Sequence, residues 1–194
     1  MIKKKVLSLI GSPREESISA HLQRLFLSGF ADFAEIEEIR VYQHEINPCT
    51  ACGHCKHLTE CVFNDGMTSL YHSLENSNFI TVSSPVYFSS LPGQLKNLID
   101  RCQVFWERKN RGGRRAVPVT GFFIAVAGSD YADMFLPSVT VIRHWFNALD
   151  IQHQAKDFIL LPSVETLTLS TLPPFVIEAV HDAGKRYAHE LRKN

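Results

Sequence analysis

The hydrophobic and polar positions of the chain repeat with two alternating periods, one typical of strands and the other of helices. Residues 5–10 form a short apolar run that ends at Gly11-Ser12-Pro13, which predicts a buried strand followed by a sharp turn. After this turn, apolar residues recur every three or four positions, which predicts an amphipathic helix. Its buried face consists of Ile18, Leu22, Leu25 and Phe26.

The same two periods continue to the end of the chain. They predict further strands at 37–42, 78–84, 117–127 and 158–161, and further helices at 67–74, 93–105, 137–149 and 173–191. Strands that alternate with helices throughout a chain predict an α/β fold. We therefore expect a doubly wound five-stranded parallel sheet in three α/β/α layers.

Two of these elements have more specific patterns. In the strand at 37–42, Ile39 and Val41 alternate with polar residues, which predicts a half-exposed strand at a margin of the sheet. The helix at 93–105 has Pro92 at its first turn and a single apolar face. That face contains Leu95, Leu98, Ile99 and Cys102. Cys102 is therefore expected in the core.

The composition indicates one domain with a full hydrophobic core. The chain has 194 residues, 45% of them hydrophobic, and its sequence shows no repeat, low-complexity tract or linker. We therefore expect a single domain over residues 1–194, with a cysteine-rich insertion at about 43–66.

The charge balance gives no electrostatic reason to expect nucleic acid or an anionic membrane as a partner, because 20 basic residues offset 20 acidic ones. No apolar stretch is long enough to span a bilayer, and the apolar run near the start is too short for a signal peptide. We therefore expect a cytoplasmic protein. Its five cysteines are then expected to be thiols or metal ligands rather than disulfides.

The turn between the first strand and the first helix has the chemistry of a phosphate site. Backbone amides and the helix N-terminus favour an anion there, and Arg14 adds a cation. The hydroxyls of Ser12, Ser17 and Ser19 converge on the same turn. Glu15 and Glu16 would repel a phosphate unless they turn outward. The glycine patterns of dinucleotide sites and P-loops are missing, which indicates a single phosphate, as on a mononucleotide; ordinary helix capping by serine is the alternative.

A second strand also ends in a loop with ligand-binding chemistry. The strand at 78–84 leads into residues 85–92, where Tyr87 and Phe88 come shortly after Ser84-Pro85 and favour contact with a flat ring over a place in the core. Parallel strands place their carboxyl ends at one edge of the sheet, so this loop is expected beside the first turn. The basic stretch at 108–115 is interpreted as a solvated surface loop, with a grip on a phosphorylated co-substrate as the alternative.

The sharpest feature of the sequence is a run of four cysteines: Cys49, Cys52, Cys55 and Cys61. Three thiolates with two-residue gaps can wrap an iron-sulfur cluster, and a fourth a few residues further on completes the coordination. Structural zinc usually takes two widely separated pairs, so it fits this spacing less well, although His54 and His57 keep zinc open. A redox pair and a loop that binds nothing are the remaining alternatives.

Taken together, these motifs resemble the NAD(P)H-dependent FMN reductase family. In chain order they are Gly11-Ser12-Pro13-Arg14 with Ser17 and Ser19, Cys49 to Cys61 followed by Asp65-Gly66-Met67, Ser84-Pro85-Val86-Tyr87-Phe88, Leu91-Pro92-Gly93-Gln94-Leu95-Lys96, and Ile99-Asp100-Arg101. The resemblance covers about residues 5–150. Within the family, the cysteine run is most similar to that of the iron-sulfur flavoproteins.

The resemblance implies a flavodoxin-like fold that binds FMN without covalent attachment. By similarity, the flavin phosphate is held by Ser12, Arg14, Ser17, Ile18 and Ser19. The isoalloxazine ring lies along Pro85, Val86, Tyr87, Phe88 and Ser89, and Gly128 with Ser129 forms a third wall. The four cysteines from Cys49 to Cys61 match the ligands of a 4Fe-4S cluster. Family members form homodimers or homotetramers, and the same is expected here.

The implied function is that of an FMN-dependent oxidoreductase. Such a protein transfers electrons from NAD(P)H or a protein donor to a quinone, flavin or protein acceptor, with the cluster as a further carrier if one is bound. The chemistry lies in the cofactor, so we expect no side chain to act as a general acid or base. A non-enzymatic, flavodoxin-like electron carrier is the alternative.

Overall fold

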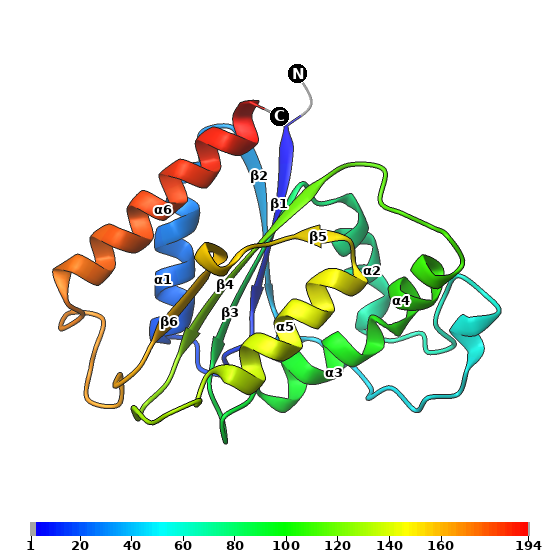
Figure 1. Cartoon of the computed structure of the whole chain (residues 1–194), viewed down its shortest axis with the longest axis horizontal. Coiled ribbons are helices and arrows are strands. Elements are labelled where there is room, and N and C mark those ends of the chain that lie inside the picture. Colours follow the sequence, from blue (N-terminus) through cyan, green and yellow to red (C-terminus); the bar gives the residue numbers. More distant parts are fainter. Residues whose placement is uncertain (1–2, 194) are drawn as a thin grey trace.

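The structure, a computed structural model, describes residues 3–193. A parallel β-sheet forms the middle layer of the protein (Figure 1). Five strands follow one another in the order β2-β1-β3-β4-β5, and β6 also pairs with β4. The strands are β1 (Lys4–Ile10), β2 (Ala34–Arg40), β3 (Phe79–Pro85), β4 (Val119–Val126), β5 (Ile151–Gln152) and β6 (Phe158–Leu161). All the pairings among them are parallel. The predicted doubly wound sheet is therefore confirmed, with β5 and β6 sharing its fifth position.

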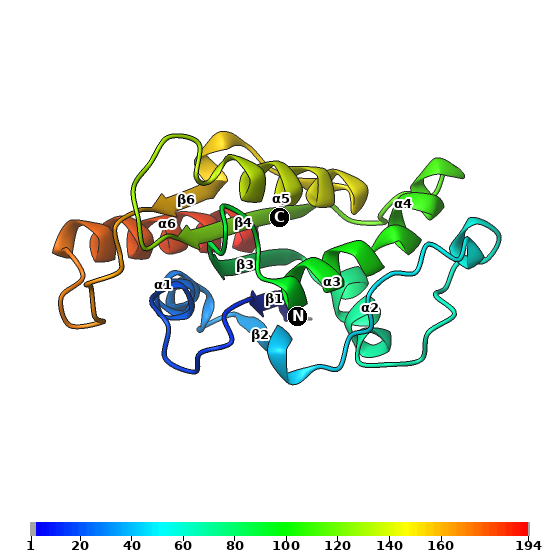
Figure 2. The same ribbon diagram turned by 90° about the horizontal axis from the view of Figure 1, so that it is seen from below.

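Helices cover both faces of the sheet, which Figure 2 shows edge-on between two helical layers. One layer consists of α1 (Ile18–Leu27) and α6 (Pro174–Lys193), and the other of α2 (Met67–Asn76), α3 (Gly93–Arg101), α4 (Gln103–Asn110) and α5 (Leu136–Ala148). Short 3-10 turns are η1 (Ser28–Phe30), η2 (Val41–Gln43), η3 (His54–Lys56) and η4 (Ala155–Asp157). Within residues 3–193, no helix has the length and apolar character needed to cross a membrane.

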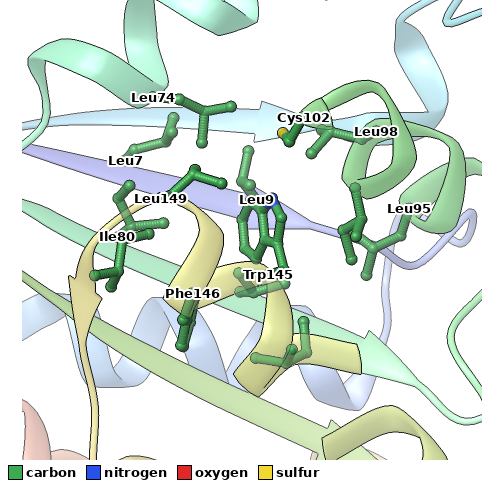
Figure 3. Close-up of a cluster of buried hydrophobic side chains, with 14 of the residues drawn as sticks. Leu7, Leu9, Leu74, Ile80, Leu95, Leu98, Cys102, Trp145, Phe146 and Leu149 are labelled. Carbon is green, nitrogen blue, oxygen red and sulfur yellow. The ribbon is translucent and has the colours of Figure 1, made fainter. Parts of the chain in front are cut away.

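The side chains of β1 divide between two hydrophobic cores, because successive residues of a strand point to opposite faces. Leu7 and Leu9 pack with α2, α3 and α5, whereas Val6 packs with α1 and α6. Figure 3 shows the first of these cores, in which Leu9 of the sheet lies beside Trp145 of α5 and Leu7 lies near Leu74 and Leu149. Burial on both faces explains why this strand is a continuous apolar run in the sequence.

The edge strand is displaced from its predicted bounds. It was expected at 37–42 but forms β2 at Ala34–Arg40, and Val41 begins the turn η2. Pairing with β1 fixes these bounds, because the register runs from Lys4 with Ala34 to Ile10 with Arg40. Ile36 packs in the core of α1 and α6, and Ile39 packs in the other core, as residues three apart in a strand must. The strand therefore has an apolar residue on each face, rather than one apolar and one polar face. Its marginal position in the sheet is confirmed.

The helix predicted at 93–105 is two helices. The backbone breaks at Cys102, where φ is -72° and ψ is 7°, and α4 continues the chain to Asn110. Cys102 itself is buried, as expected, and burial raises the pKa of its thiol to about 12. The two-residue strand β5 was also missed, because so short a pairing leaves no periodic signal.

Candidate functional site

The carboxyl ends of β1, β3 and β4 bring their loops together at one edge of the sheet. The Gly11 N–H donates to the Ser83 carbonyl (2.8 Å), and the Val86 N–H donates to the Val126 carbonyl (2.8 Å). These two bonds tie each loop to the neighbouring strand. The first turn therefore lies beside the loop that follows β3, as the sequence predicts for parallel strands.

The first turn leads directly into the N-terminus of α1. Ser17 has extended backbone angles and caps the helix, since its Oγ accepts a hydrogen bond from the Ala20 N–H (3.2 Å). The hydroxyls of Ser17 and Ser19 lie 3.4 Å apart. Ser12 turns inward, is 1% exposed, and accepts a bond from the Arg14 N–H (3.3 Å). The turn thus combines a capped helix N-terminus with clustered hydroxyls, which suits an anion.

These loops enclose a pocket of about 630 Å³ at the carboxyl edge. Among the residues expected from the sequence, its lining includes Arg14, Ser17, Ile18, Ser19, Pro85, Val86, Tyr87 and Gly128. The remaining expected residues, Ser12, Phe88, Ser89 and Ser129, are not part of the lining that the described residues form. The volume is within the usual range of small-molecule and cofactor sites.

Phe88 lies outside the pocket because the chain reverses sharply there. Tyr87 and Ser90 exchange two backbone hydrogen bonds of 2.9 and 3.0 Å, and between them Phe88 and Ser89 have positive φ angles of 48° and 61°. The Phe88 side chain is fully exposed as a result. The Ser89 hydroxyl instead contacts the Tyr131 hydroxyl (2.6 Å), which joins this turn to the loop after β4.

A fourth segment, which the sequence did not reveal, completes the pocket. Residues Val164, Glu165, Leu167, Thr168, Leu169 and Ser170 line its far side. Their segment is held there because the Val164 N–H donates to the Ala127 carbonyl (3.0 Å) at the end of β4. A side chain on Gly128 would overlap the Glu165 carboxylate. The available signal was the predicted strand at 158–161, whose carboxyl end leads into this segment.

The two glutamates of the first turn differ in their surroundings. Glu15 is 89% exposed and faces Arg40 at 3.5 Å, so it points away from the pocket. Arg40 also donates to the Arg14 carbonyl (3.1 Å), which fixes the turn from β2. Glu16 lines the pocket together with Arg14. Glu15 would thus not repel a phosphate bound in the pocket. Glu16 would, but Arg14 lines the same pocket and brings a positive charge.

The four cysteines line a second cavity, of about 320 Å³, next to α3 and α4. Burial raises the pKa of the Cys55 thiol, and the neighbouring Glu107 and Cys49 raise it further. In the part of the chain that the structure describes, no three His, Cys, Asp or Glu side chains converge on one point. Ligands of a single zinc ion must meet at one point, whereas cysteines around a cluster each bind a different iron. Within the described residues, the four thiols therefore border one cavity without forming the ligand set of a single metal ion.

The basic stretch at 108–115 has structural contacts. Arg111 donates to the carbonyls of Cys55 and Lys56, and Arg115 donates to those of Leu74 and Glu75 at the end of α2. None of these basic residues belongs to the lining of the 630 Å³ pocket within the described chain. The structure therefore does not support binding of a phosphorylated co-substrate by these residues. Arg111 and Arg115 hold neighbouring segments rather than remaining free in solvent.

A doubly wound parallel sheet with a mononucleotide-sized pocket outside its carboxyl ends defines a flavodoxin-like α/β protein. Residues 4–159 match the family model described as NADPH-dependent FMN reductase. The chain belongs to this family, which confirms the resemblance of its motifs.

Similar proteins include two named iron-sulfur flavoprotein. The one from Archaeoglobus fulgidus is 34% identical over 115 residues, which are 57% of this chain and 50% of the relative. The one from Methanosarcina thermophila is 35% identical over 130 residues, 64% of each chain. The matched part thus spans about half to two thirds of the length of these curated relatives.

Solved structures share the fold at low sequence identity. An FMN-dependent NADH-azoreductase from Bacillus anthracis in complex with FMN has a TM-score of 0.72 at 16% identity, covering 95% of this chain and 100% of that one. An NAD(P)H:quinone oxidoreductase from Methanothermobacter marburgensis has a TM-score of 0.67 at 14% identity, covering 98% of each. These similarities confirm the flavodoxin-like fold.

Proposed function

We propose that this protein is an FMN-dependent oxidoreductase that moves electrons from NAD(P)H or a protein donor to a quinone, flavin or protein acceptor. The proposal rests on the pocket of about 630 Å³, where a helix N-terminus meets the loops after β3 and β4. Bound FMN would supply the electron-transfer chemistry, and the protein would supply binding and orientation. Family membership supports the proposal, because the family is described by NADPH and FMN.

The first turn fits the phosphate of FMN. Arg14 offers a guanidinium, and Ser17 and Ser19 offer hydroxyls at the positive end of the α1 dipole. Ile18 would contribute its backbone amide, and Ser12 would shape the turn through its bond with the Arg14 N–H. In this proposal, Glu16 would have to point away from the anion.

The loops after β3 and β4 fit a flat ring. Pro85, Val86 and Tyr87 line one side of the pocket, and Gly128 lines another. We assign the ring to this space, with the backbone of the loops as the source of hydrogen bonds. Phe88, Ser89 and Ser129, which are not in the lining that the described residues form, would contact a bound acceptor or a second subunit. The 164–170 segment, which lines the far side, would limit which acceptors enter.

The cysteine cavity is the proposed site of an iron-sulfur cluster, with Cys49, Cys52, Cys55 and Cys61 as ligands. All four thiols border one cavity, and relatives with the name iron-sulfur flavoprotein match the chain at 34% and 35% identity. A bound cluster would supply one-electron transfer. It would let the protein serve a one-electron partner as well as a two-electron donor.

Anaerobic purification followed by an absorption spectrum and by iron, sulfide and zinc analysis tests both cofactors. We expect a yellow-brown protein that binds one FMN per chain and that oxidises NADH or NADPH with a quinone as acceptor. Turnover with neither nucleotide, together with clean reduction by a ferredoxin, would favour an electron carrier. A colourless protein with stoichiometric zinc and no saturable FMN uptake would contradict the proposal.

A further inference from the structure

The cysteine segment, residues 47–65, is fastened to the rest of the fold by arginine side chains. It runs along the outside of α3 and α4 and includes only the short turn η3 as regular structure (Figures 1 and 2). Such a segment has little apolar burial of its own to hold it in one shape. Two arginines, Arg101 and Arg111, contact it at its two ends and at its outer turn.

Arg101 joins the two ends of the cysteine segment. Its guanidinium donates to the Asn47 carbonyl (2.9 Å) and, through both terminal nitrogens, to the Asp65 carboxylate (2.7 and 3.2 Å). Asp65 also accepts hydrogen bonds from the Asn47 N–H (3.0 Å) and the Met67 N–H (3.0 Å). The side chains of Arg101 and Asp65 are 1% and 9% exposed. The start and end of the segment are thereby held at one buried ion pair.

Arg111 holds the outer turn. From the C-terminal end of α4 it donates to the carbonyls of Cys55 (2.9 Å), Lys56 (2.8 Å) and Leu58 (3.3 Å). Within the same turn, the Lys56 N–H donates to the Gly53 carbonyl (3.0 Å), and the Leu58 N–H donates to the His54 carbonyl (3.1 Å). The arginine uses backbone acceptors alone, so the thiol of Cys55 stays available to the cavity.

Arg101 also borders the cavity that the cysteines line. The Phe63 ring lies over its guanidinium, at 5.0 Å from the ring centre. Its Nε–H is buried and has no acceptor among the described residues. The Asp65 carboxylate already balances the charge of this guanidinium, so Arg101 acts beside the cavity by holding the segment in place.

We propose that Arg101 and Arg111 are positioning residues, which hold the cysteine segment in the shape needed to bind a cluster before any iron is bound. The proposal rests on the cysteine segment being the iron-sulfur site. A pre-organised site loses less conformational entropy on binding, so iron is taken up more readily and released more slowly.

Amide hydrogen exchange on the metal-free protein tests the positioning role without any cofactor. Arg111→Ala is compared with wild type and with Arg114→Ala, a control in the same stretch whose guanidinium, among the described residues, donates to the carbonyls of Lys109 and Gly113 and not to the cysteine segment. We expect the amides of residues 56–58 to exchange about tenfold faster in Arg111→Ala, because their turn loses the hydrogen bonds that the charged Arg111 side chain donates to its carbonyls. Wild-type exchange rates in Arg111→Ala would overturn the proposal.

Reconstitution with ferrous iron and sulfide under anaerobic conditions tests the consequence for binding. We expect Arg111→Ala to lose iron to a chelator several-fold faster than wild type and Arg114→Ala. We expect Arg101→Lys to lose iron faster as well, and in this variant the amide of Asn47 should also exchange faster than in wild type. Iron release from Arg111→Ala at the wild-type rate would contradict the proposal. If wild type takes up no iron, the cluster assignment fails, and the exchange rates still decide whether the arginines hold the segment. If Arg101→Lys does not fold, the Arg111 and Arg114 variants decide alone.

Discussion

At the scale of single residues, Ser17 has two roles that substitution can separate. Its hydroxyl caps α1 and also lines the carboxyl-edge pocket. An aspartate at this position is an equally good cap but places a negative charge where we propose the FMN phosphate. The cap and the anion site therefore respond differently to Ser17→Ala and Ser17→Asp.

Ser17→Ala is expected to lower the free energy of unfolding by about 1 kcal/mol, because the cap is lost. Ser17→Asp is expected to unfold at the wild-type urea concentration, yet to bind FMN at least about tenfold more weakly, since a like charge in the site costs more than 1.4 kcal/mol. Urea unfolding and an FMN fluorescence titration measure the two effects. FMN affinity unchanged in Ser17→Asp would place the phosphate elsewhere.

The buried pair of Asp65 and Arg101 makes stability depend on acid pH. Burial by itself would raise the pKa of the Asp65 carboxyl, but hydrogen bonds from Arg101 and from the Asn47 and Met67 amides outweigh it and hold the pKa well below its usual value. A carboxyl with a lowered pKa stabilises the fold fully above its unfolded pKa of about 4, and this contribution is lost as the pH falls below that value.

Asp65→Asn is therefore expected to cost about 3–5 kcal/mol at pH 7, because it leaves a buried guanidinium without its charge partner. The difference from wild type should shrink as the pH falls from about 5 to 3. Urea unfolding at several pH values measures it. A difference that stays constant across this range would show that the carboxylate is not stabilised by the pair.

Several site residues follow from the sequence, and others do not, for reasons visible at individual positions. Ser17 and Tyr87 were predictable because each lies in the loop that follows a buried strand. Phe88 was expected in the site, but a left-handed turn directs it to solvent, and such backbone angles are not encoded by a phenylalanine. Glu165 gave no local signal, since its place in the pocket depends on how β6 pairs with β4.

At the scale of elements, α1 and α6 approach so closely that one position admits only glycine. A side chain on Gly184 of α6 would overlap the Phe26 carbonyl of α1, and one on Gly29 would meet the Gly184 backbone at 2.9 Å. Backbone atoms cannot rotate away from such an overlap as a flexible side chain can. The two helices would have to separate.

Gly184→Ala is therefore expected to lower the free energy of unfolding by about 1–3 kcal/mol through overpacking. The usual effect of this substitution inside a helix is the opposite, a gain of about 1 kcal/mol. Gly93→Ala, at the open first position of α3 with no neighbour within 4 Å, is the control and should remain within about 0.5 kcal/mol of wild type. Equal stabilities of the two variants in urea would contradict the close packing.

The elements themselves were predictable where local periodicity and packing agree. The strand at 78–84 is buried on both faces and appears as β3 with its end one residue later. The break at Cys102 was not predictable, because no glycine or proline marks it and the apolar pattern continues to Phe105. Packing of α4 against the cysteine segment and α5, rather than local sequence, accompanies that change of direction.

At the scale of the whole molecule, large apolar side chains gather beside the carboxyl-edge pocket. Phe88 is fully exposed and Tyr131 is more than half exposed, on two loops that a hydrogen bond between Ser89 and Tyr131 joins. Leu136, also more than half exposed, begins α5 directly after the second loop. We propose that this surface is the contact of the expected homodimer or homotetramer. Such a contact would cover the open side of the pocket.

Phe88→Asp is expected to shift the protein toward monomers, because a buried unpaired carboxylate opposes association. Trp106→Asp, an exposed aromatic on α4 at the other end of the molecule, is the control (Figure 2). Sedimentation velocity at several protein concentrations measures the assembly state. If Trp106→Asp dissociates the protein and Phe88→Asp does not, the contact lies on the cysteine side instead.

The overall architecture could be predicted because strands and helices alternate along the whole chain, which leaves few topologies for a parallel sheet. The relative position of the two cavities could not. The cysteine segment gave no periodic signal, and its place beside α4 depends on the contacts of Arg111 with carbonyls more than 50 residues away. A side chain that binds backbone acceptors leaves no complementary residue type in the sequence to reveal it.

The two margins of the sheet differ from its centre in a way that affects behaviour at high concentration. One margin is β2, which contains Glu35, Glu37 and Glu38, and the other is divided between β5 and β6, of two and four residues. Clustered like charges and interrupted edges are poor templates for strand addition by another molecule. Concentrated solutions should therefore remain free of fibrillar aggregates, because the edge strands of one molecule do not readily pair with those of the next.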